Sequence, residues 1–403
     1  MARRRRKLIL TASALTASTR ALALGLPALL LPFPAAANEP APKITAAVER
    51  HWTSNALDSE FAVADWYTLL RGSLRHEIGD DEANAGIAAE FQLTRHDRIA
   101  IEDDRSMAVS AHAFRRLSPK LELRGTLTWS ALSKGDHLEF GPLVIGTRAL
   151  KQVAAAQVQM GIAVDNATAL VLDISNVFET TGRTRFEEGI IEPVRLDPDV
   201  NKFRLAARAM RTFGPLAAGG SLSALFATVE KLGSPPVALS YALYGAQGEL
   251  EMRTQAGLAL GMVLGAEALR GAHGIYADIK PAWNVKASMP LPKDFELRGA
   301  WFGRYETGDS DDPLASWLRR AEVELGWKAT QRLALSAGVY REVKQNLLME
   351  NEERGRGFYA EATYALGKPL SAVFRVDVSK TFKTILDIRE RTTSAFIGLR
   401  ARI

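Results

Sequence analysis

The sequence predicts an all-β protein, a transmembrane antiparallel up-and-down β-barrel of about 18 strands. Apolar and polar residues alternate with a period of two along most of the chain, as they do on a strand with one apolar face. Short turns and longer polar connections follow each other between these segments, which is the wiring of an outer-membrane barrel. The 403 residues include no cysteine, which excludes a disulfide framework and a thiolate metal site.

The first 37 residues have the pattern of a signal peptide for general secretion. Arg3–Lys7 is a basic start, an apolar stretch follows, and Ala35–Ala37 is a small-residue cleavage site. A flexible basic tail is the other interpretation. This segment holds six Lys and Arg and no acid, so the rest of the chain has 45 basic and 46 acidic residues. The overall charge of +5 therefore does not indicate nucleic-acid binding.

Period-two alternation is clearest at residues 121–131. Leu127 and Trp129 lie on one face of this segment, and Glu122 and Arg124 lie on the other. Helical spacing fits the segment poorly. The same alternation recurs over 295–306, 370–379 and 393–403, where Phe396 is an exception on the polar face. We therefore expect strands that are apolar on one side only.

Counting the alternating segments gives the size of the barrel. We expect strands running one way to begin near Ile44, Asn84, Leu121, Thr168, Gly219, Gly248, Phe295, Leu333 and Leu370. Each hairpin takes about 40 residues, which gives about 18 strands, or 16 if one weak hairpin is lost. A soluble β-propeller would need four short strands per unit, and a β-sandwich rarely repeats so often. The expected organisation is a signal peptide at 1–37, a short lead at 38–43 and the barrel at 44–403.

Two local features resemble known outer-membrane proteins. The alternating last strand resembles the C-terminal signal of bacterial outer-membrane proteins, although Ile403 stands where an aromatic residue is usual. The segment Arg50-His-Trp-Thr-Ser-Asn55, followed by Asp65-Trp-Tyr67, resembles the start of the β-barrel porin families of proteobacteria. This resemblance implies residence in the bacterial outer membrane and pore formation, and it supplies no catalytic residues.

The polar face of such a barrel lines the lumen, because the apolar face meets lipid. The charged residues that we expect there, as candidates for selectivity, are Arg71, Arg75, Arg124, Arg204, Arg208, Arg298, Arg304, Arg320, Arg375, Glu322, Glu324 and Asp377. An excess of arginine would favour anionic solutes. The alternative is that cross-strand ion pairs merely solvate the wall.

Aromatic residues on the apolar face are candidates for the girdles at the two membrane interfaces. These are Trp129, Trp301, Trp317 and Trp327. Trp317 and Trp327 are separated by a strand length that rises about 25 Å, the height of the apolar band. Two tryptophans in a sandwich core are the other interpretation.

Other signals are weaker. The connection at 180–201 is the best candidate for an inward-folding loop, with an ordinary solvated loop as the alternative. The histidines show no metal-ligand spacing, and Asp309, Asp311 and Asp312 are better explained as a solvated acidic loop than as a cation site. We expect no enzyme activity, no catalytic residue, no metal and no cofactor.

The expected function is a channel for passive diffusion of small hydrophilic solutes, mildly favouring anions. The alternative is an export or structural barrel that works with envelope partners, for example in polysaccharide export. The sequence shows no aromatic run down one lumen face, which favours the channel. A barrel enzyme is a third hypothesis. The expected partners are outer-membrane lipids and lipopolysaccharide, the barrel-assembly machinery and small solutes, with no nucleic acid; the oligomeric state is left open.

Overall fold

The structure is a computed structural model that describes residues 41–57, 62–140, 143–187, 191–233, 238–307, 314–348, 351–384 and 388–402. The expected signal peptide and the acidic residues Asp309, Asp311 and Asp312 lie outside the described residues. Within the described ranges no helix is long and apolar enough to cross a membrane.

One sheet of nineteen strands contains almost all of the regular structure in these ranges. Its first half is β1 (Lys43–Thr53), β2 (Asp65–Gly79), β3 (Ala83–His96), β4 (Asp104–Ser118), β5 (Leu121–Phe140), β6 (Leu143–Ala163), β7 (Thr168–Thr181), β8 (Arg185–Phe186) and β9 (Val200–Phe213). Its second half is β10 (Leu216–Val229), β11 (Tyr241–Arg253), β12 (Ala259–Gly271), β13 (Ala277–Leu291), β14 (Phe295–Glu306), β15 (Ser316–Lys328), β16 (Leu333–Asn346), β17 (Glu352–Ala365), β18 (Leu370–Lys383) and β19 (Ile388–Arg402). Two short 3₁₀ turns, η1 (Ala100–Glu102) and η3 (Ala272–Gly274), lie in connections.

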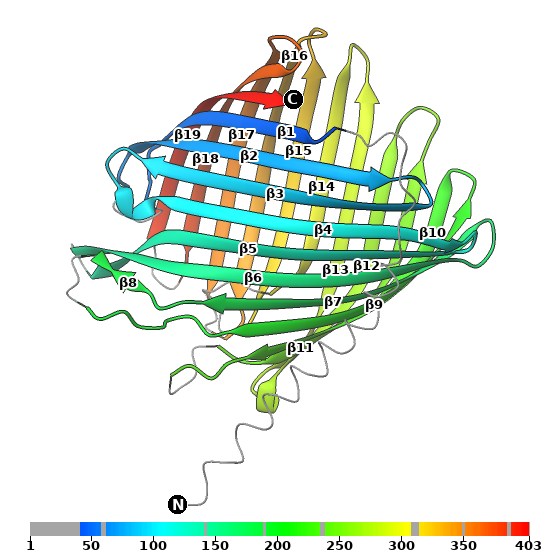
Figure 1. Ribbon diagram of the computed structural model, residues 1–403, viewed down its shortest axis with the longest axis horizontal. Coiled ribbons are helices and arrows are strands. Elements are labelled where there is room, and N and C mark those ends of the chain that lie inside the picture. The colour runs from blue at the N-terminus through cyan, green and yellow to red at the C-terminus, as the bar shows by residue number, and fades with distance from the viewer. Residues whose placement is uncertain are drawn as a thin grey trace, which may run out of the picture.

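The sheet closes into a barrel because its first and last strands pair. Blue β1 runs beside red β19 in Figure 1, and the two are antiparallel in register from Thr45 opposite Arg402 to Thr53 opposite Ser394. The two-residue β8 stands outside this ring, so the closed wall has 18 strands, as the sequence predicts. Closure gives every edge strand a hydrogen-bonding partner.

The two ends of the barrel differ in their connections. At the short-turn end, tight turns join strands such as β6 and β7, where the Asp165 carboxylate accepts hydrogen bonds from the N–H groups of Ala167 and Thr168, both at 2.8 Å. Such side-chain to backbone bonds are typical of Asp in turns. At the other end, which we call the long-loop end, most of the connections are longer.

The faces of the wall follow from cross-strand register, because residues directly opposite each other in an antiparallel pair point to the same side. Glu49 and Leu69 are opposite each other and buried, which marks the inner face. The outer face carries large apolar side chains with high exposure, such as Ile279 at 70%, Leu222 at 65% and Ile397 at 60%. This arrangement is inside-out relative to a soluble protein and suits a barrel surrounded by lipid.

The structure corrects two of the predicted element boundaries. The strand expected from Gly248 begins instead at Ala259, and Gly248 lies inside β11 opposite Gly220. The turn between β11 and β12 uses Gly257 in the left-handed region, with φ of +86°, and its N–H donates to the Thr254 carbonyl oxygen. Small residues on both sides of this turn weaken the alternation that the prediction relied on.

The second correction concerns the polar connection expected at 133–150. Here β5 and β6 stay paired as far as Phe140 opposite Leu143 and form the longest hairpin of the barrel. On β5, the described outer-face residues of this segment are Ser133, Gly135 and His137, in place of the large apolar residues that mark strands lower in the wall. A polar stretch therefore indicates a part of the strand close to the long-loop end of the barrel, and not the end of the strand.

At the long-loop end, β14 leaves the wall. Pairing between β13 and β14 stops at Trp283 opposite Gly303. If the same register continued, Pro281 would lie opposite Tyr305, and proline has no N–H to donate to the neighbouring strand. The Tyr305 N–H instead donates to Glu267 on the inner face of β12, at 3.0 Å. Because β13 separates β12 from β14 in the wall, the end of β14 passes over the inner side of β13.

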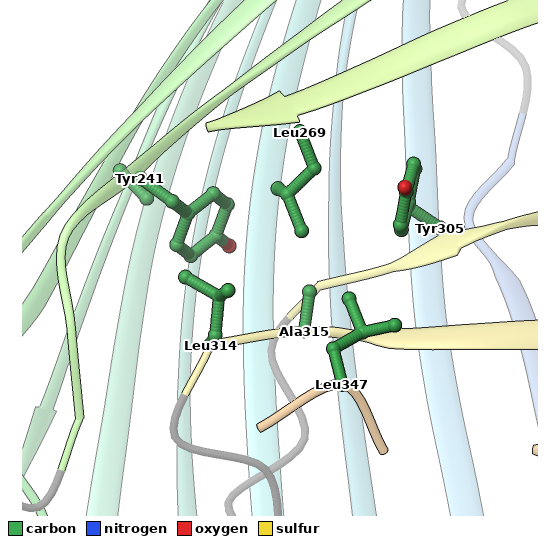
Figure 2. Close-up of a cluster of buried hydrophobic side chains, with 7 residues drawn as sticks. Tyr241, Leu269, Tyr305, Leu314, Ala315 and Leu347 are labelled. Atoms are coloured by element: carbon green, nitrogen blue, oxygen red, sulfur yellow. The ribbon is translucent and has the colours of Figure 1, made fainter. Parts of the chain in front are cut away.

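A buried apolar cluster holds this inward-folded end in place (Figure 2). It contains Ala227, Tyr241, Leu269, Tyr305, Leu314, Ala315 and Leu347. We call this cluster, with the paired ends of β14 and β15, the rim shelf. The described part of the 180–201 connection behaves differently, because β8 pairs with Thr147 and Arg148 of β6 and extends the wall. In the described residues, the ends of β14 and β15 therefore fold inward, and β8 of the connection that the sequence suggested does not.

Candidate functional site

The charged residues expected in the lumen all lie at inner-face positions of the register. Arg71 is opposite Ala47 and Gln92, Arg124 is opposite Phe114 and Gln159, and the remaining arginines and carboxylates follow the same parity around the wall. Most of these arginines are paired with carboxylates. Arg75 donates to Glu77 at 2.8 Å, and Arg124 pairs with Glu122 at 3.3 Å.

The densest set of these ion pairs lies on β14–β18. The guanidinium of Arg298 binds Glu296 at 2.6 Å and Glu324 at 3.0 Å. Further round the wall, the guanidinium of Arg320 binds Glu322 at 2.8 Å and Glu342 at 3.3 Å, and that of Arg375 binds Asp377 at 2.7 Å and Glu361 at 3.7 Å. All of these groups except Glu342 and Asp377 line a lumenal recess of about 660 Å³.

Two tyrosines complete this recess, and the sequence analysis did not single them out. The Arg375 guanidinium lies 4.5 Å from the ring centre of Tyr359, and that of Arg320 lies 4.6 Å from Tyr340. The Tyr359 hydroxyl is within hydrogen-bonding distance of both Glu322, at 3.0 Å, and Glu324. Each tyrosine is opposite a glycine, and a Cβ on Gly338 would come within 2.6 Å of the Tyr359 ring and hydroxyl. Only the register between strands shows these contacts.

A second charged group lies where the barrel closes. The carboxylate of Glu49, only 1% exposed, accepts hydrogen bonds from Arg400 of β19 at 3.0 Å and lies 3.0 Å from His51 Nε2. Arg71 of β2 adds a longer contact to the same carboxylate, at 3.8 Å. We call these residues the seam network, because Glu49 links the first two strands to the last.

Four rings, including His51 of the seam network, pack against one another across neighbouring strands on the long-loop side of Glu49. The order is Phe396 of β19, His51 of β1, Tyr67 of β2 and His96 of β3, with centroid separations of 4.6, 4.6 and 4.8 Å. Alternation within one strand cannot reveal a row that runs across strands, and Phe396 was the exception in its own strand. The rings cover one another's faces. Few ring faces are therefore left to stack against a sugar, as a polysaccharide channel would require.

Two lumenal arginines near Glu267 have no close carboxylate partner among the described residues. Arg204 and Arg304 both lie close enough to interact electrostatically with the Glu267 carboxylate, which also accepts the N–H of Tyr305. Among the described residues neither arginine forms an ion pair within 4 Å. With Asp173, Glu249 and Arg208, which is paired with Glu249, these groups line a recess of about 380 Å³ beside the rim shelf, which we call the Glu267 recess.

The predicted girdle tryptophans have two different environments. Trp129, Trp301 and Trp327 lie on the outer face and are 38%, 54% and 38% exposed. Trp317 is half-buried, because the rim shelf carries it inward against the ammonium group of Lys280, 4.9 Å from its ring, and the guanidinium of Arg319, 4.7 Å away. A membrane-interface role for the three outer tryptophans stays a prediction.

A cluster at the long-loop end brings together Glu102, Asp136 and His137, whose potential ligand atoms lie within 4.8 Å of one another. His137 Nδ1 is 2.9 Å from Glu102, and burial raises the pKa of the Glu102 carboxyl. The Lys134 ammonium lies 3.2 Å from Asp136 and so already supplies positive charge. Spacing along the sequence could not find this cluster, because Glu102 comes from a different connection. The contacts fasten η1 to the long β5–β6 hairpin.

Comparisons with known proteins concern the fold. No known protein family matches the sequence, and no curated protein is similar to it in sequence. The copper transporter OprC matches with a TM-score of 0.57 and 8% identity, over 92% of this chain and 82% of OprC. OccK2 (OpdF) of Pseudomonas aeruginosa matches with a TM-score of 0.50 and 12% identity, over 90% of this chain and 97% of that one. The fold is that of outer-membrane β-barrels.

Proposed function

We propose that the chain is an outer-membrane transport barrel and works as a passive diffusion channel for small hydrophilic solutes. The observation that carries the proposal is the closed wall of 18 strands, apolar outside and densely charged inside. A barrel of 16 or more strands is wide enough to enclose an aqueous channel unless a plug fills it. Such residence would bring contact with outer-membrane lipids and lipopolysaccharide, and insertion by the barrel-assembly machinery.

Uptake into vesicles tests passive diffusion directly. Proteoliposomes that contain the refolded barrel should swell in isotonic solutions of small sugars and amino acids, at rates that fall as solute size increases. Protein-free vesicles are the control. Vesicles that hold folded barrel and still exclude every small solute would contradict a diffusion channel.

We further propose that the channel has a mild preference for anions and that the Glu267 recess causes it. Elsewhere in the described lumen most arginines share their charge with carboxylates 2.6–3.8 Å away, so they contribute little net field. At the Glu267 recess, Arg204 and Arg304 have no such partner within 4 Å among the described residues, although Asp173, Glu249 and Glu267 also line the recess. Cations that no carboxylate binds directly attract anions in a narrow aqueous passage.

The reversal potential under a salt gradient measures this preference. We expect the double variant Arg204→Gln/Arg304→Gln to move the reversal potential toward cation preference. The matched control Arg298→Gln/Glu324→Gln keeps the net charge and should leave the potential close to that of the wild type. An unchanged potential in the first variant would mean that the Glu267 recess does not set selectivity.

A further inference from the structure

Four cations form a continuous row on the outer face of β16–β19, near the long-loop end. Arg341 is opposite Arg356, Arg356 is opposite Lys380, and Lys380 is opposite Arg391. We call these four residues the basic row. Each is exposed, and each belongs to a different strand.

The basic row lies directly at the edge of the apolar outer face. One step toward the short-turn end, the same strands carry Val339, Phe358 and Val378, opposite one another in register. Val339 is 57% exposed and Phe358 is 46% exposed, as expected for side chains that meet lipid. The outer face therefore changes from apolar to basic between one outward residue of each strand and the next.

The row concentrates positive charge that the protein itself does not neutralise. Cα atoms of directly opposite residues are only about 5 Å apart, and like charges placed there repel. No member of the row has a carboxylate within 4 Å among the described residues. Among the described residues of β16–β19, the outward acid is Glu352, which is already bound by Arg354 and lies 3.7 Å from Arg319. Arg389, on the next outward row, adds further positive charge.

We propose that the basic row binds the phosphates of a multiply phosphorylated lipid headgroup and holds that lipid against β16–β19. This inference rests on the proposed outer-membrane location. In that location the edge of the apolar face meets the headgroups, and the long-loop end faces outward. Three strand spacings make the row about 14 Å long, which suits two or more phosphates better than one. Arginine is well suited to phosphate because its planar guanidinium binds two oxygens at once.

Binding of defined lipids to the full chain, refolded in neutral detergent, tests the proposal. The probes are bisphosphorylated lipid A and the same lipid with its phosphates removed. We expect the wild type to bind the phosphorylated lipid at least about tenfold more tightly, with affinity falling as salt rises. The variant Arg341→Gln/Arg356→Gln/Lys380→Gln/Arg391→Gln should lose most of this difference.

A matched variant tests whether lipid binding depends on the basic row itself or only on the net charge of the protein. Arg95, Arg105, Arg211 and Arg270 are exposed outer-face arginines, and none of them is opposite another cation. Their fourfold change to Gln should leave lipid binding as in the wild type. Equal loss in both fourfold variants would overturn the proposal, and so would equal affinity for the dephosphorylated lipid.

Two further measurements remove the remaining ambiguities. Inorganic phosphate at millimolar concentration should not displace the lipid; full displacement would mean a free-phosphate site and would contradict lipid binding. Single-channel conductance of the basic-row variant should equal that of the wild type, which shows that the barrel is folded. A silent wild-type channel that still shows phosphate-dependent lipid binding would refute the proposed function and leave this inference standing.

Discussion

Glu49 shows how much one inner side chain contributes to barrel closure. Its carboxylate is buried and hydrogen-bonded to Arg400, with His51 beside it. The substitution Glu49→Gln removes the negative charge and leaves the guanidinium of Arg400 without its partner. The Arg400 side chain is 42% exposed, so water can replace part of the lost contact. Hydrogen bonds to charged groups contribute about 1.5–3 kcal/mol, and we expect the free energy of unfolding to fall by about that amount. Urea unfolding in phospholipid vesicles measures it.

Glu90 provides the matched control for Glu49. It is also an inner-face glutamate, opposite Ser73 and Ala108, but its side chain is exposed. Glu90→Gln should change stability by less than about 0.5 kcal/mol, as is usual for exposed positions. If both variants lose the same stability, the seam network does not hold the barrel closed.

Glu102 gives a pH-dependent prediction at the long-loop end. Burial raises the pKa of its carboxyl above the ordinary value of 4.5, so the folded state favours the protonated form more than the unfolded state does. Stability linked to this group is present below the ordinary pKa and is lost as the pH rises through the raised one. The variant Glu102→Gln cannot ionise, so its stability relative to the wild type should increase as the pH rises above the ordinary pKa of 4.5 and level off above the raised pKa.

Urea midpoints at several pH values test this, with Glu192→Gln, an exposed loop position, as the control. If the difference in stability between Glu102→Gln and the wild type does not change with pH, the Glu102 carboxyl does not have the raised pKa that its burial implies. Spacing along the sequence assigns no role to Glu102, because its partner His137 comes from another hairpin.

At the scale of elements, the rim shelf brings the described ends of β14 and β15 over the inner side of the wall. Leu314 is 3% exposed and packs in the cluster with Tyr241 and Leu269. Leu314→Ala should weaken the packing of the shelf by about 2–5 kcal/mol, which favours release of the β14–β15 end from the inner wall. We therefore expect larger single-channel conductance with more frequent fluctuations.

The control for the shelf is a leucine of the outer face. Leu222 is 65% exposed, so Leu222→Ala does not touch the shelf and should leave the conductance unchanged. Unchanged conductance in Leu314→Ala as well would mean that the shelf does not limit ion flow.

Alternation predicted most strands but not their ends. Lipid outside and water inside impose a strict period of two, so the segment at 121–131 could be read without a structure. The start of β12 was missed because alanines and glycines on both sides of Thr254 blur the contrast between the faces. The rim shelf was also missed, because it depends on Pro281 lying beside β14, which is a relation between strands.

At the scale of the whole molecule, the sequence shows which residues face inward but not how they pair. The parity of each strand placed Arg298, Arg320 and Arg375 on the polar side. Their carboxylate partners on other strands, and the rings of Tyr340 and Tyr359 between them, depend on the register around the ring. The ion-paired wall was an alternative in the sequence analysis, and the structure shows pairing for most of these arginines.

The central claim is that the closed wall surrounds an open aqueous passage. Single-channel recording of the refolded barrel in a planar bilayer, under a salt gradient, tests it most directly. We expect large, stable conductance steps and a reversal potential slightly on the anion side. A correctly folded barrel that inserts and stays electrically silent would contradict the diffusion channel and favour a plugged or partner-gated barrel.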